Sequence, residues 1–437
     1  MEWQLVLALL FATMLALMAT GIPIALALIL TDLVWAFVLW GGHTGLIQIT
    51  YSIAGSVTKF ALLPIPLFVL MGEVMFHTRL GIDMIQAASQ WMGRIAGRLS
   101  LLAVGTGVIL ATLTGASVSA VAILGTTLLP DMVSREYKKP MTIGPILGSG
   151  GLAIMIPPSA MAVLLGAVAQ VSIAELLIAI IVPGIVMAGL YAAYIVVRCS
   201  IDPSLAPAYE IASVPLSVKL RDTIRYLVPL GFVIVMVTGV IFLGLTTPSE
   251  AAATGALATF IIALAYGRAD KSTVVNAIAS TVRITGMMFL IVVGATVFSQ
   301  LLATTGGGRG LAELAVGLPV PPLVIILAMM AVVLVMGCFM DVLAIMMITL
   351  PIFMPVVKAL HYDPIWFCVL FMINLEVALI SPPFGMSLFV MKGVAPEDYT
   401  IQDIYVGALP FVLLDLLAMA LIILFPDIAL WLPSRMR

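Results

Sequence analysis

Four short interruptions of apolar sequence hold the side chains with the most chemistry to offer. The stretches TGASVS (114–119) and MGCFMD (336–341) combine glycine with serine hydroxyls or with an aspartate carboxylate. Such oxygens, together with main-chain carbonyls released from a helix, are the ligands that a hard cation such as Na⁺ prefers. The amide ends of helices that start at these points would attract an anion. The pattern therefore indicates a site for a cation and an anionic solute.

The other two interruptions each contain a Pro-Pro pair, in GGLAIMIPPSAM (150–161) and LEVALISPPFGM (375–386). Adjacent prolines remove two amide donors and cannot continue a straight helix. Irregular main chain at membrane depth is tolerated only where protein or a wet cavity shelters it. We therefore assign the hydroxyls and main chain around the two breaks to substrate binding: Ser149, Pro157, Pro158, Ser159, Ser381, Pro382, Pro383 and Gly385.

These assignments have structural alternatives. Small residues such as Gly115, Ser117 and Ser119 also allow helices to pack closely in membranes. Asp341 is either a functional acid at membrane depth or the N-cap of the helix that follows it, and one residue could fill both roles. Glu376 belongs to the second break, pairs with a partner subunit, or lies near the rim of the membrane.

Motifs for catalysis and for ATP hydrolysis are missing from the sequence. It contains no HExxH or Walker pattern, and its three cysteines, Cys199, Cys338 and Cys368, lie far apart with no metal-binding spacing. We predict that the protein is not an enzyme and uses no cofactor. Its energy should come from an ion gradient.

The composition is typical of an integral membrane protein. Hydrophobic residues make up 63% of the 437 residues and charged residues only 9%, with a mean hydropathy of +1.25. A soluble domain carries about 25% charged residues, so most of this surface must face lipid. The net charge of −2 argues against nucleic acid as a partner. Apolar runs near the length of one membrane span fall at 3–20, 22–40, 60–77, 175–197, 226–244, 250–267, 284–302 and 406–432.

The interruptions recur in the same order in both halves of the chain. An interval of 225 residues separates Pro157 from Pro382 and also Pro23 from Pro248, which lie in two turns between apolar runs. Matching order at a fixed interval is typical of internal transporter repeats. We interpret the interrupted segments as two re-entrant hairpins (100–130 and 320–357) and two broken helices (141–167 and 364–391). The predicted units are residues 1–200, a connector at 201–225 and residues 226–437.

Five crossings in each half would invert the second half relative to the first. If the N-terminus lies outside, fourteen of the 19 Lys and Arg residues fall on the cytoplasmic side and five on the outer side, as the positive-inside rule expects. Both termini are then periplasmic. The predicted fold is an all-α integral membrane protein with two inverted-topology repeats, each with a re-entrant hairpin and a Pro-Pro-broken helix.

These stretches together resemble the large membrane subunit, of the DctM type, of a tripartite ATP-independent periplasmic (TRAP) transporter. The resemblance covers nearly the whole chain. It rests on the order and spacing of TGxSxxxVAxLG (114–125), the glycine-rich Pro-Pro break (150–159), TTPSEAAATGAL (246–257), GxxxD (337–341), NLEVALISPPFGMSLFVMKGVAP (374–396) and DIYVGALPF (403–411).

The resemblance implies an elevator-type ion transporter fold, in which hairpins and broken helices move against a scaffold. It implies uptake of an organic acid across the bacterial inner membrane, driven by Na⁺ as the coupling ion. A periplasmic binding protein would deliver the substrate, and a small four-helix membrane subunit, expected as a separate chain, would brace the scaffold. Family Na⁺ sites map by motif to Gly115, Ser117, Ser119, Gly150, Gly151, Gly337, Asp341 and Asn374. Many relatives have Ala-Asp where this chain has Ser119-Ala120, so an acid is missing from the first tip.

Three other functions compete with this one. The nearest is a self-sufficient sodium–dicarboxylate or anion carrier of the same architecture, which would work without partner proteins. An intramembrane enzyme would need a nucleophile with a base, or a metal cluster, within the spans, and the sequence offers neither. A channel fits less well, because two inverted hairpins suit alternating access better than a permanent pore.

Overall fold

The fold is described from a computed structural model, which covers residues 3–436 except 94, 115–116, 210–213 and 338–339. Every regular element within these residues is a helix. Seven of the described helices are long and apolar enough to cross a membrane, and a bent pair would add an eighth span. The chain is thus an all-α, multi-pass membrane protein, as its composition predicts.

A hairpin and a broken helix form the centre of the first half. Helices α6 (Arg98–Thr114) and α7 (Ser117–Ser134) follow one another across residues 115–116 and pack together against α8 (Lys139–Met155). The chain then bends by 49° at the first Pro-Pro pair before α9 (Ala160–Ala169) begins. Proline cannot supply the amide donors that a continuous helix needs, so the bend falls where the prolines are.

The second half has the same sequence of elements. Helices α17 (Pro322–Gly337) and α18 (Val342–Ala359) are separated by residues 338–341, and both pack against α19 (Pro364–Ile380). The second Pro-Pro pair ends α19, and α20 (Met386–Val394) follows. Helix α7 packs against α20, and α18 packs against α9. Each hairpin therefore contacts the broken helix of the opposite half.

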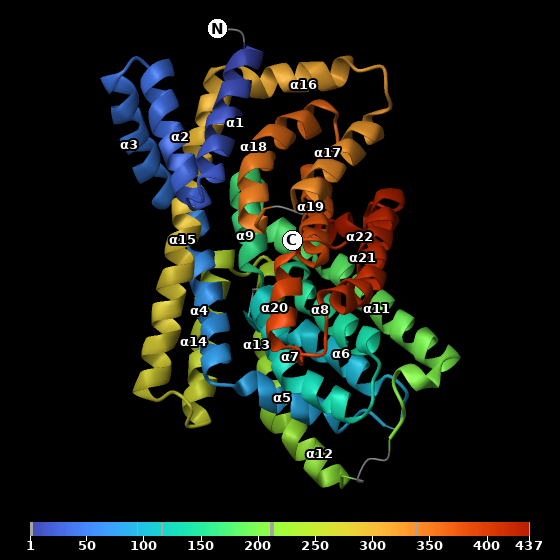
Figure 1. Cartoon of the computed structure of the whole chain (residues 1–437). Coiled ribbons are helices and arrows are strands. Elements are labelled where there is room, and N and C mark those ends of the chain that lie inside the picture. The colour runs from blue at the N-terminus through green and yellow to red at the C-terminus, as the bar shows by residue number, and fades with distance from the viewer. Residues whose placement is uncertain (1–2, 94, 115–116, 210–213, 338–339, 437) are drawn as a thin grey trace.

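The remaining helices surround this centre. Long helices α2, α4, α14 and α15 lie side by side along one flank, while α11 and α21 pack beside α8 on the other (Figure 1). Their bounds are α1 (Trp3–Ala19), α2 (Ile24–Leu39), α3 (His43–Val57), α4 (Pro64–His77), α5 (Leu80–Ser89), α10 (Ile173–Ala179), α11 (Ile181–Ile201), α12 (Leu216–Asp222), α13 (Val228–Phe242), α14 (Pro248–Ala265), α15 (Lys271–Thr304), α16 (Gly307–Gly317), α21 (Ile401–Leu424) and α22 (Asp427–Leu430).

Four helices, α3, α5, α12 and α16, were not anticipated from the apolar runs. Helix α3 contains polar residues such as His43, Gln48 and Ser52, and α5 and α16 are short, with apolar residues on one face only. Helix α15 has 34 residues and begins well before the apolar run at 284–302. Hydropathy alone misses such segments because their helical structure depends on packing against neighbours.

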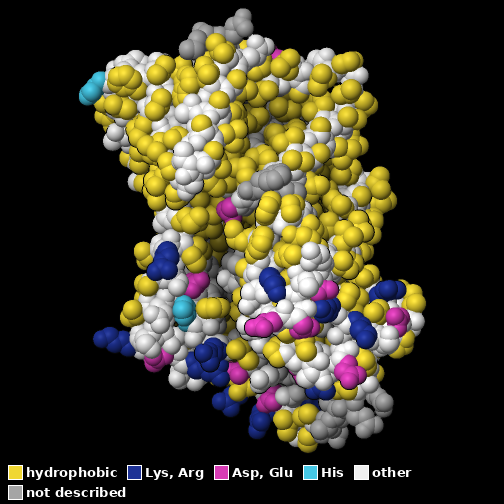
Figure 2. Space-filling view, in the orientation of Figure 1, with side chains coloured by type: hydrophobic (Ala, Val, Ile, Leu, Met, Phe, Trp, Pro, Cys, Tyr) yellow, Lys and Arg dark blue, Asp and Glu magenta, His cyan; other side chains and the backbone are white. Residues whose placement is uncertain are grey.

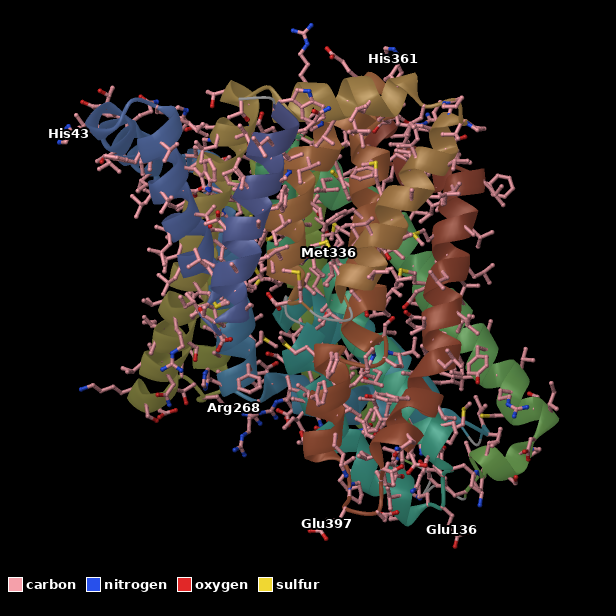
Figure 3. All side chains as sticks on the ribbon, turned by 45° about the horizontal axis from the view of Figure 1, so that its top comes forward. His43, Glu136, Arg268, Met336, His361 and Glu397 are labelled. Carbon is pink, nitrogen blue, oxygen red and sulfur yellow. The ribbon has the colours of Figure 1, made fainter. Side chains whose placement is uncertain are left out.

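Charged side chains are concentrated toward one end of the molecule. Figure 2 shows Lys, Arg, Asp and Glu gathered in the lower part of this face, whereas the upper part is almost entirely apolar. Arg268, Glu136 and Glu397 lie toward that charged end in Figure 3, and His43 and His361 lie toward the other. Met336, next to the end of α17, lies between the two ends. The end of α17 therefore lies at a level between the two ends of the molecule rather than at either of them.

Candidate functional site

The first hairpin brings two predicted Na⁺ residues next to α8. Gly115 lies outside the described residues. Ser117 starts α7 and is buried, and its hydroxyl has no hydrogen-bond partner among the described residues, whereas Ser119 is half-buried. A Cβ on Gly150 would lie 2.2 Å from Val121 Cγ2 and 3.3 Å from the Ser117 carbonyl oxygen. Glycine at 150 thus lets α8 approach the first turn of α7 at its main chain.

The first Pro-Pro break is completely buried. Pro157 and Pro158 are joined by a cis peptide bond, and Ser159 accepts a hydrogen bond from the Ala162 amide (3.3 Å) as the N-cap of α9. The Ser149 hydroxyl donates to the Pro145 carbonyl within α8. Ser149 also packs against Gly107 of α6. Its hydroxyl is thus engaged in a hydrogen bond within α8.

The second hairpin ends at Gly337 and resumes at Asp341. Gly337 lies against Ala378 of α19, because a Cβ at 337 would be 2.3 Å from the Ala378 Cβ. Asp341 is the N-cap of α18, and its carboxylate accepts a hydrogen bond from the Leu343 amide at 3.0 Å. The capping interpretation is therefore confirmed. The side chain stays half-buried, so the carboxylate remains able to serve another role as well.

Asn374 offers an unused oxygen beside this hairpin. It is fully buried on α19, and its amide nitrogen donates to the Met330 carbonyl of α17 at 2.6 Å. Its Oδ1 has no partner among the described residues. A buried acceptor without a donor is unfavourable by about 1–3 kcal/mol, and a bound cation would satisfy it.

The second Pro-Pro break differs from the first in its exposure. Ser381 is buried at the end of α19, but Pro382 is half-buried and Pro383 is exposed. The Pro383 carbonyl accepts a hydrogen bond from the Tyr405 hydroxyl at 2.7 Å. Gly385 passes close to main-chain oxygens, since a Cβ there would lie 2.5 Å from the Leu379 oxygen.

A buried contact between the two broken helices was not anticipated. Glu376 of α19 is fully buried and its carboxylate lies against Gly151 of α8, where a Cβ would be 0.9 Å from Oε1. Neither oxygen of Glu376 has a hydrogen-bond partner among the described residues. Asp415 of α21, also buried, accepts a hydrogen bond from the Tyr191 hydroxyl of α11. The only sequence signal for these buried acids was the presence of one acidic residue in the middle of an apolar helix, Glu376 in α19 and Asp415 in α21.

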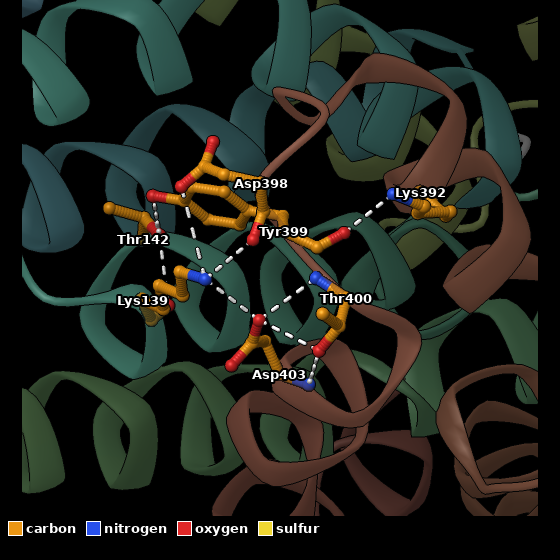
Figure 4. Close-up of polar contacts among 7 residues, drawn as sticks. All are labelled: Lys139, Thr142, Lys392, Asp398, Tyr399, Thr400 and Asp403. Carbon is orange, nitrogen blue, oxygen red and sulfur yellow. Dashed lines mark hydrogen bonds and ion pairs between the residues drawn. The ribbon is translucent and has the colours of Figure 1, made fainter.

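A polar network at the charged end ties α8 to the segment between α20 and α21 (Figure 4). The Lys139 ammonium group lies 2.8 Å from the Asp403 carboxylate and also donates to the Asp398 carbonyl at 2.7 Å. Asp403 in turn accepts from the main chain and hydroxyl of Thr400 at the start of α21. Lys392, at the end of α20, donates to the Tyr399 carbonyl. The start of α8 and the segment that follows the second break are thereby held together.

Among the described residues, two cavities separate a hairpin from the surrounding helices. The larger, which we name the Arg79 chamber, has a volume of about 380 Å³. It is lined by the α4–α5 junction, including Phe76, His77 and Arg79, and by hairpin residues such as Leu110 and Thr126. A furrow between the two flanks of the molecule is visible in Figure 2.

The smaller cavity, which we name the Lys59 pocket, has a volume of about 130 Å³. It is lined by Lys59 and Gln170, by Ser299 and Gln300 of α15, and by Pro351 of α18. The Arg79 chamber thus borders the first hairpin, and the Lys59 pocket borders the second.

Next to the Arg79 chamber is a more polar cavity of about 500 Å³ that shares His77, Arg79 and Ile82 with it. There Arg268 forms an ion pair with Asp83 at 2.6 Å. Asp270 accepts hydrogen bonds from the hydroxyls of Ser272 and Thr273, which hold the pKa of its carboxyl at about 2. This carboxylate is therefore ionised and already engaged in capping α15.

Known proteins match the chain along its length. It is similar to the C4-dicarboxylate TRAP transporter large permease protein DctM of Rhodobacter capsulatus, with 30% identity over 97% of this chain and 98% of that protein. It is 27% identical to the ectoine TRAP transporter large permease protein TeaC of Halomonas elongata, over 96% and 97% of the two chains. The YdaH transporter of Alcanivorax borkumensis has a similar fold, with a TM-score of 0.64, 16% identity and 90% of each chain covered.

The family itself follows from a match over most of the sequence. Residues 11–428 fit the model of the tripartite ATP-independent periplasmic transporter, DctM component. Proteins of this family are membrane transport components and not enzymes, and the name denotes one part of a three-part system. The chain belongs to the DctM component family of TRAP transporters, as the large permease subunit.

Proposed function

We propose that this subunit takes up an organic acid across the bacterial inner membrane, coupled to Na⁺ entry. A periplasmic binding protein delivers the substrate, and a small membrane subunit on a separate chain braces the scaffold. The observation that carries the proposal is that a hairpin and a Pro-Pro break meet in each half of a chain whose family transports solutes. Paired interruptions of this kind at membrane depth provide ion and substrate sites in secondary transporters.

The two halves are, in this proposal, inverted repeats. The element order of α6–α9 matches that of α17–α20, and each hairpin packs on the broken helix of the opposite half. The amphipathic helices α5 and α16, which precede the two hairpins, lie toward opposite ends of the molecule in Figure 1. With the charged end facing the cytoplasm, both termini are periplasmic, in agreement with the distribution of Lys and Arg.

The Na⁺ sites lie between each tip and its broken helix. Ser117 contributes an unpaired hydroxyl beside Gly150, and Asn374 contributes an unpaired amide oxygen near Gly337. Asp341 adds a carboxylate next to the second tip. Na⁺ binds to several oxygen ligands, which can be hydroxyl, amide, carbonyl or carboxylate oxygens. Neutral oxygens bind the ion weakly enough for it to be released again.

An elevator movement would carry these sites between the two sides. The Arg79 chamber and the Lys59 pocket both separate a hairpin from the flank that contains α4 and α15. Sliding of the hairpin unit along that flank would open one cavity and close the other. A C4-dicarboxylate is the first substrate to test, because the R. capsulatus relative is described as a C4-dicarboxylate transporter.

Transport in reconstituted liposomes tests the proposal. Succinate uptake should depend on an inward Na⁺ gradient and on a purified binding protein at the outer face. Ser117→Ala, Ser119→Ala and Asp341→Ala should each weaken the dependence on Na⁺, whereas Ser134→Ala, at an exposed position in α7, should not.

Two results would count against this reading. Normal Na⁺ dependence in all three site variants would remove the proposed ion sites. Full-rate transport without a binding protein would instead favour the self-sufficient carrier of the same architecture.

A further inference from the structure

The main chain at Arg79 is unusual, and its side chain lines a cavity. Helix α4 ends at His77 and α5 begins at Leu80, and Arg79 between them has a φ of 55°. Residues with a Cβ rarely take this left-handed conformation, which glycine adopts without strain. A position that would suit glycine thus carries a long cationic side chain at the wall of the Arg79 chamber.

Arg79 is also free to bind a ligand. It is the only permanently charged side chain among the described residues that line the chamber, and none of the described carboxylates forms an ion pair with it. Arg268 nearby is already committed, to Asp83 at 2.6 Å and to the Thr78 carbonyl at 3.2 Å. An unpaired guanidinium presents a planar fork of N–H donors that matches a carboxylate.

The opposite wall of the chamber comes from the first hairpin. Leu110 belongs to α6, and Ile123, Thr126 and Thr127 belong to α7. The chamber therefore lies between the part that we propose to move and the flank that we propose to stay fixed. Its volume of about 380 Å³ falls within the range of small-molecule sites.

We propose that the Arg79 chamber is a release site for the substrate on the cytoplasmic side, where Arg79 binds the carboxylate after it leaves the Pro-Pro breaks. This inference rests on the proposed function, because it takes an organic acid as the solute. It assigns to the α4–α5 junction an anion-binding role that is separate from the hairpin tips.

The effect of Arg79 on the electrostatic potential in the chamber can be measured without a transport assay. In a background with Cys199→Ser, Cys338→Ala and Cys368→Ala, Thr126→Cys places one thiol, exposed on α7, in the chamber wall. Anionic and cationic methanethiosulfonate reagents of similar size are added from the cytoplasmic side. We expect the anionic reagent to be favoured, and Arg79→Gln to reduce the anionic-to-cationic rate ratio by about tenfold, which corresponds to 1.4 kcal/mol.

A matched control removes a charge from the same end of the molecule but not from the chamber. Arg221 is 69% exposed, is paired with Asp222 and does not line the chamber. Arg221→Gln should leave the ratio unchanged. An equal loss in both variants, or no loss with Arg79→Gln, overturns the proposal.

Binding of the anion is the second measurement. Succinate should slow labelling of the thiol at 126, whereas the uncharged analogue succinamide should not, and Arg79→Gln should abolish the protection while Arg79→Lys retains part of it. Equal protection with and without Arg79 overturns the proposal. A failure of the proposed function would appear separately, as absence of Na⁺-driven succinate uptake by the unmodified protein.

Discussion

The two cavities beside the hairpins are built alike but differ in size. The Arg79 chamber borders the first hairpin and has about 380 Å³, whereas the Lys59 pocket borders the second and has about 130 Å³. Each has one cation at its wall, and each separates a hairpin from the flanking helices. Similar construction with unequal volume is what a two-state carrier shows when one entrance is open and the other closed. In the proposed elevator mechanism, the difference would correspond to a conformation open toward the charged end.

The two Pro-Pro breaks show a related asymmetry. Residues around Pro157 and Pro158 are fully buried, while Pro383 and Phe384 are exposed. The exposed break is nevertheless tightly built, because Gly385 approaches the main-chain oxygens of Leu379 and Ser381. Exposure therefore does not mean that the second break is loosely packed.

The largest loss of stability is expected when the close packing at Gly385 is disturbed. In Gly385→Ala the new methyl group would lie 2.5 Å from the Leu379 oxygen, so main chain must move. We expect a loss of about 3 kcal/mol in the free energy of unfolding, measured by thermal melting in detergent. Gly393→Ala in α20, the helix that begins directly after Gly385, has open space at its Cβ and is the matched control. Similar melting of the two variants would show the break to be loose after all.

A somewhat smaller effect should appear where the two halves meet. Gly151→Ala would place a methyl group on the Glu376 carboxylate, and a side chain can relocate more easily than main chain can. We expect a loss of about 2 kcal/mol, largely restored in the double variant Gly151→Ala, Glu376→Ala. Gly189→Ala, which has no neighbour within 4 Å, gives the baseline. Strictly additive losses would disprove the contact.

Accessibility of the two cavities should differ by about tenfold, if a 1.4 kcal/mol preference for one conformation is taken as the scale. A thiol introduced at Thr126 in the Arg79 chamber should react with a water-soluble maleimide faster than one introduced at Ser299 in the Lys59 pocket. Each is labelled from the side it is predicted to face. Equal rates would mean that the unequal volumes do not report a resting preference.

The smallest effect is expected at the network that joins the start of α8 to the segment after the second break. Asp403→Asn removes the ion pair with Lys139 but keeps the capping position of the side chain. Both partners are partly exposed, so water and salt already screen the attraction. We expect a slight fall in melting temperature that disappears at high salt, with Asp398→Asn as the comparison. A large loss at high salt would show that the network acts through packing instead.

The interruptions of the sequence fall at or near the ends of helices. The predicted hairpin at 100–130 corresponds to α6 and α7, and Pro157 and Pro382 end α8 and α19 within a few residues. Proline and glycine are informative because their restrictions are local and do not depend on partners. Asp341 shows the same point, since an N-cap role follows from its position before an apolar helix.

Contacts between segments that are distant in the sequence could not be predicted from these local patterns. The position of Glu376 against Gly151 depends on how α8 crosses α19, and the free donors of Arg79 depend on which carboxylates lie near it. Both are properties of the packed molecule. The polar helix α3 was missed for the same reason, because neighbours rather than hydropathy stabilise it.

The length of α15 has a consequence for how the protein sits in its membrane. Thirty-four residues extend for about 51 Å at 1.5 Å per residue, whereas the hydrocarbon layer is about 30 Å thick. One end of this helix must therefore stand in the headgroup region or beyond it, even if the helix tilts. Bilayer thickness then determines how deep the flank lies in the membrane and, in the proposed elevator movement, the height from which the hairpin unit would start.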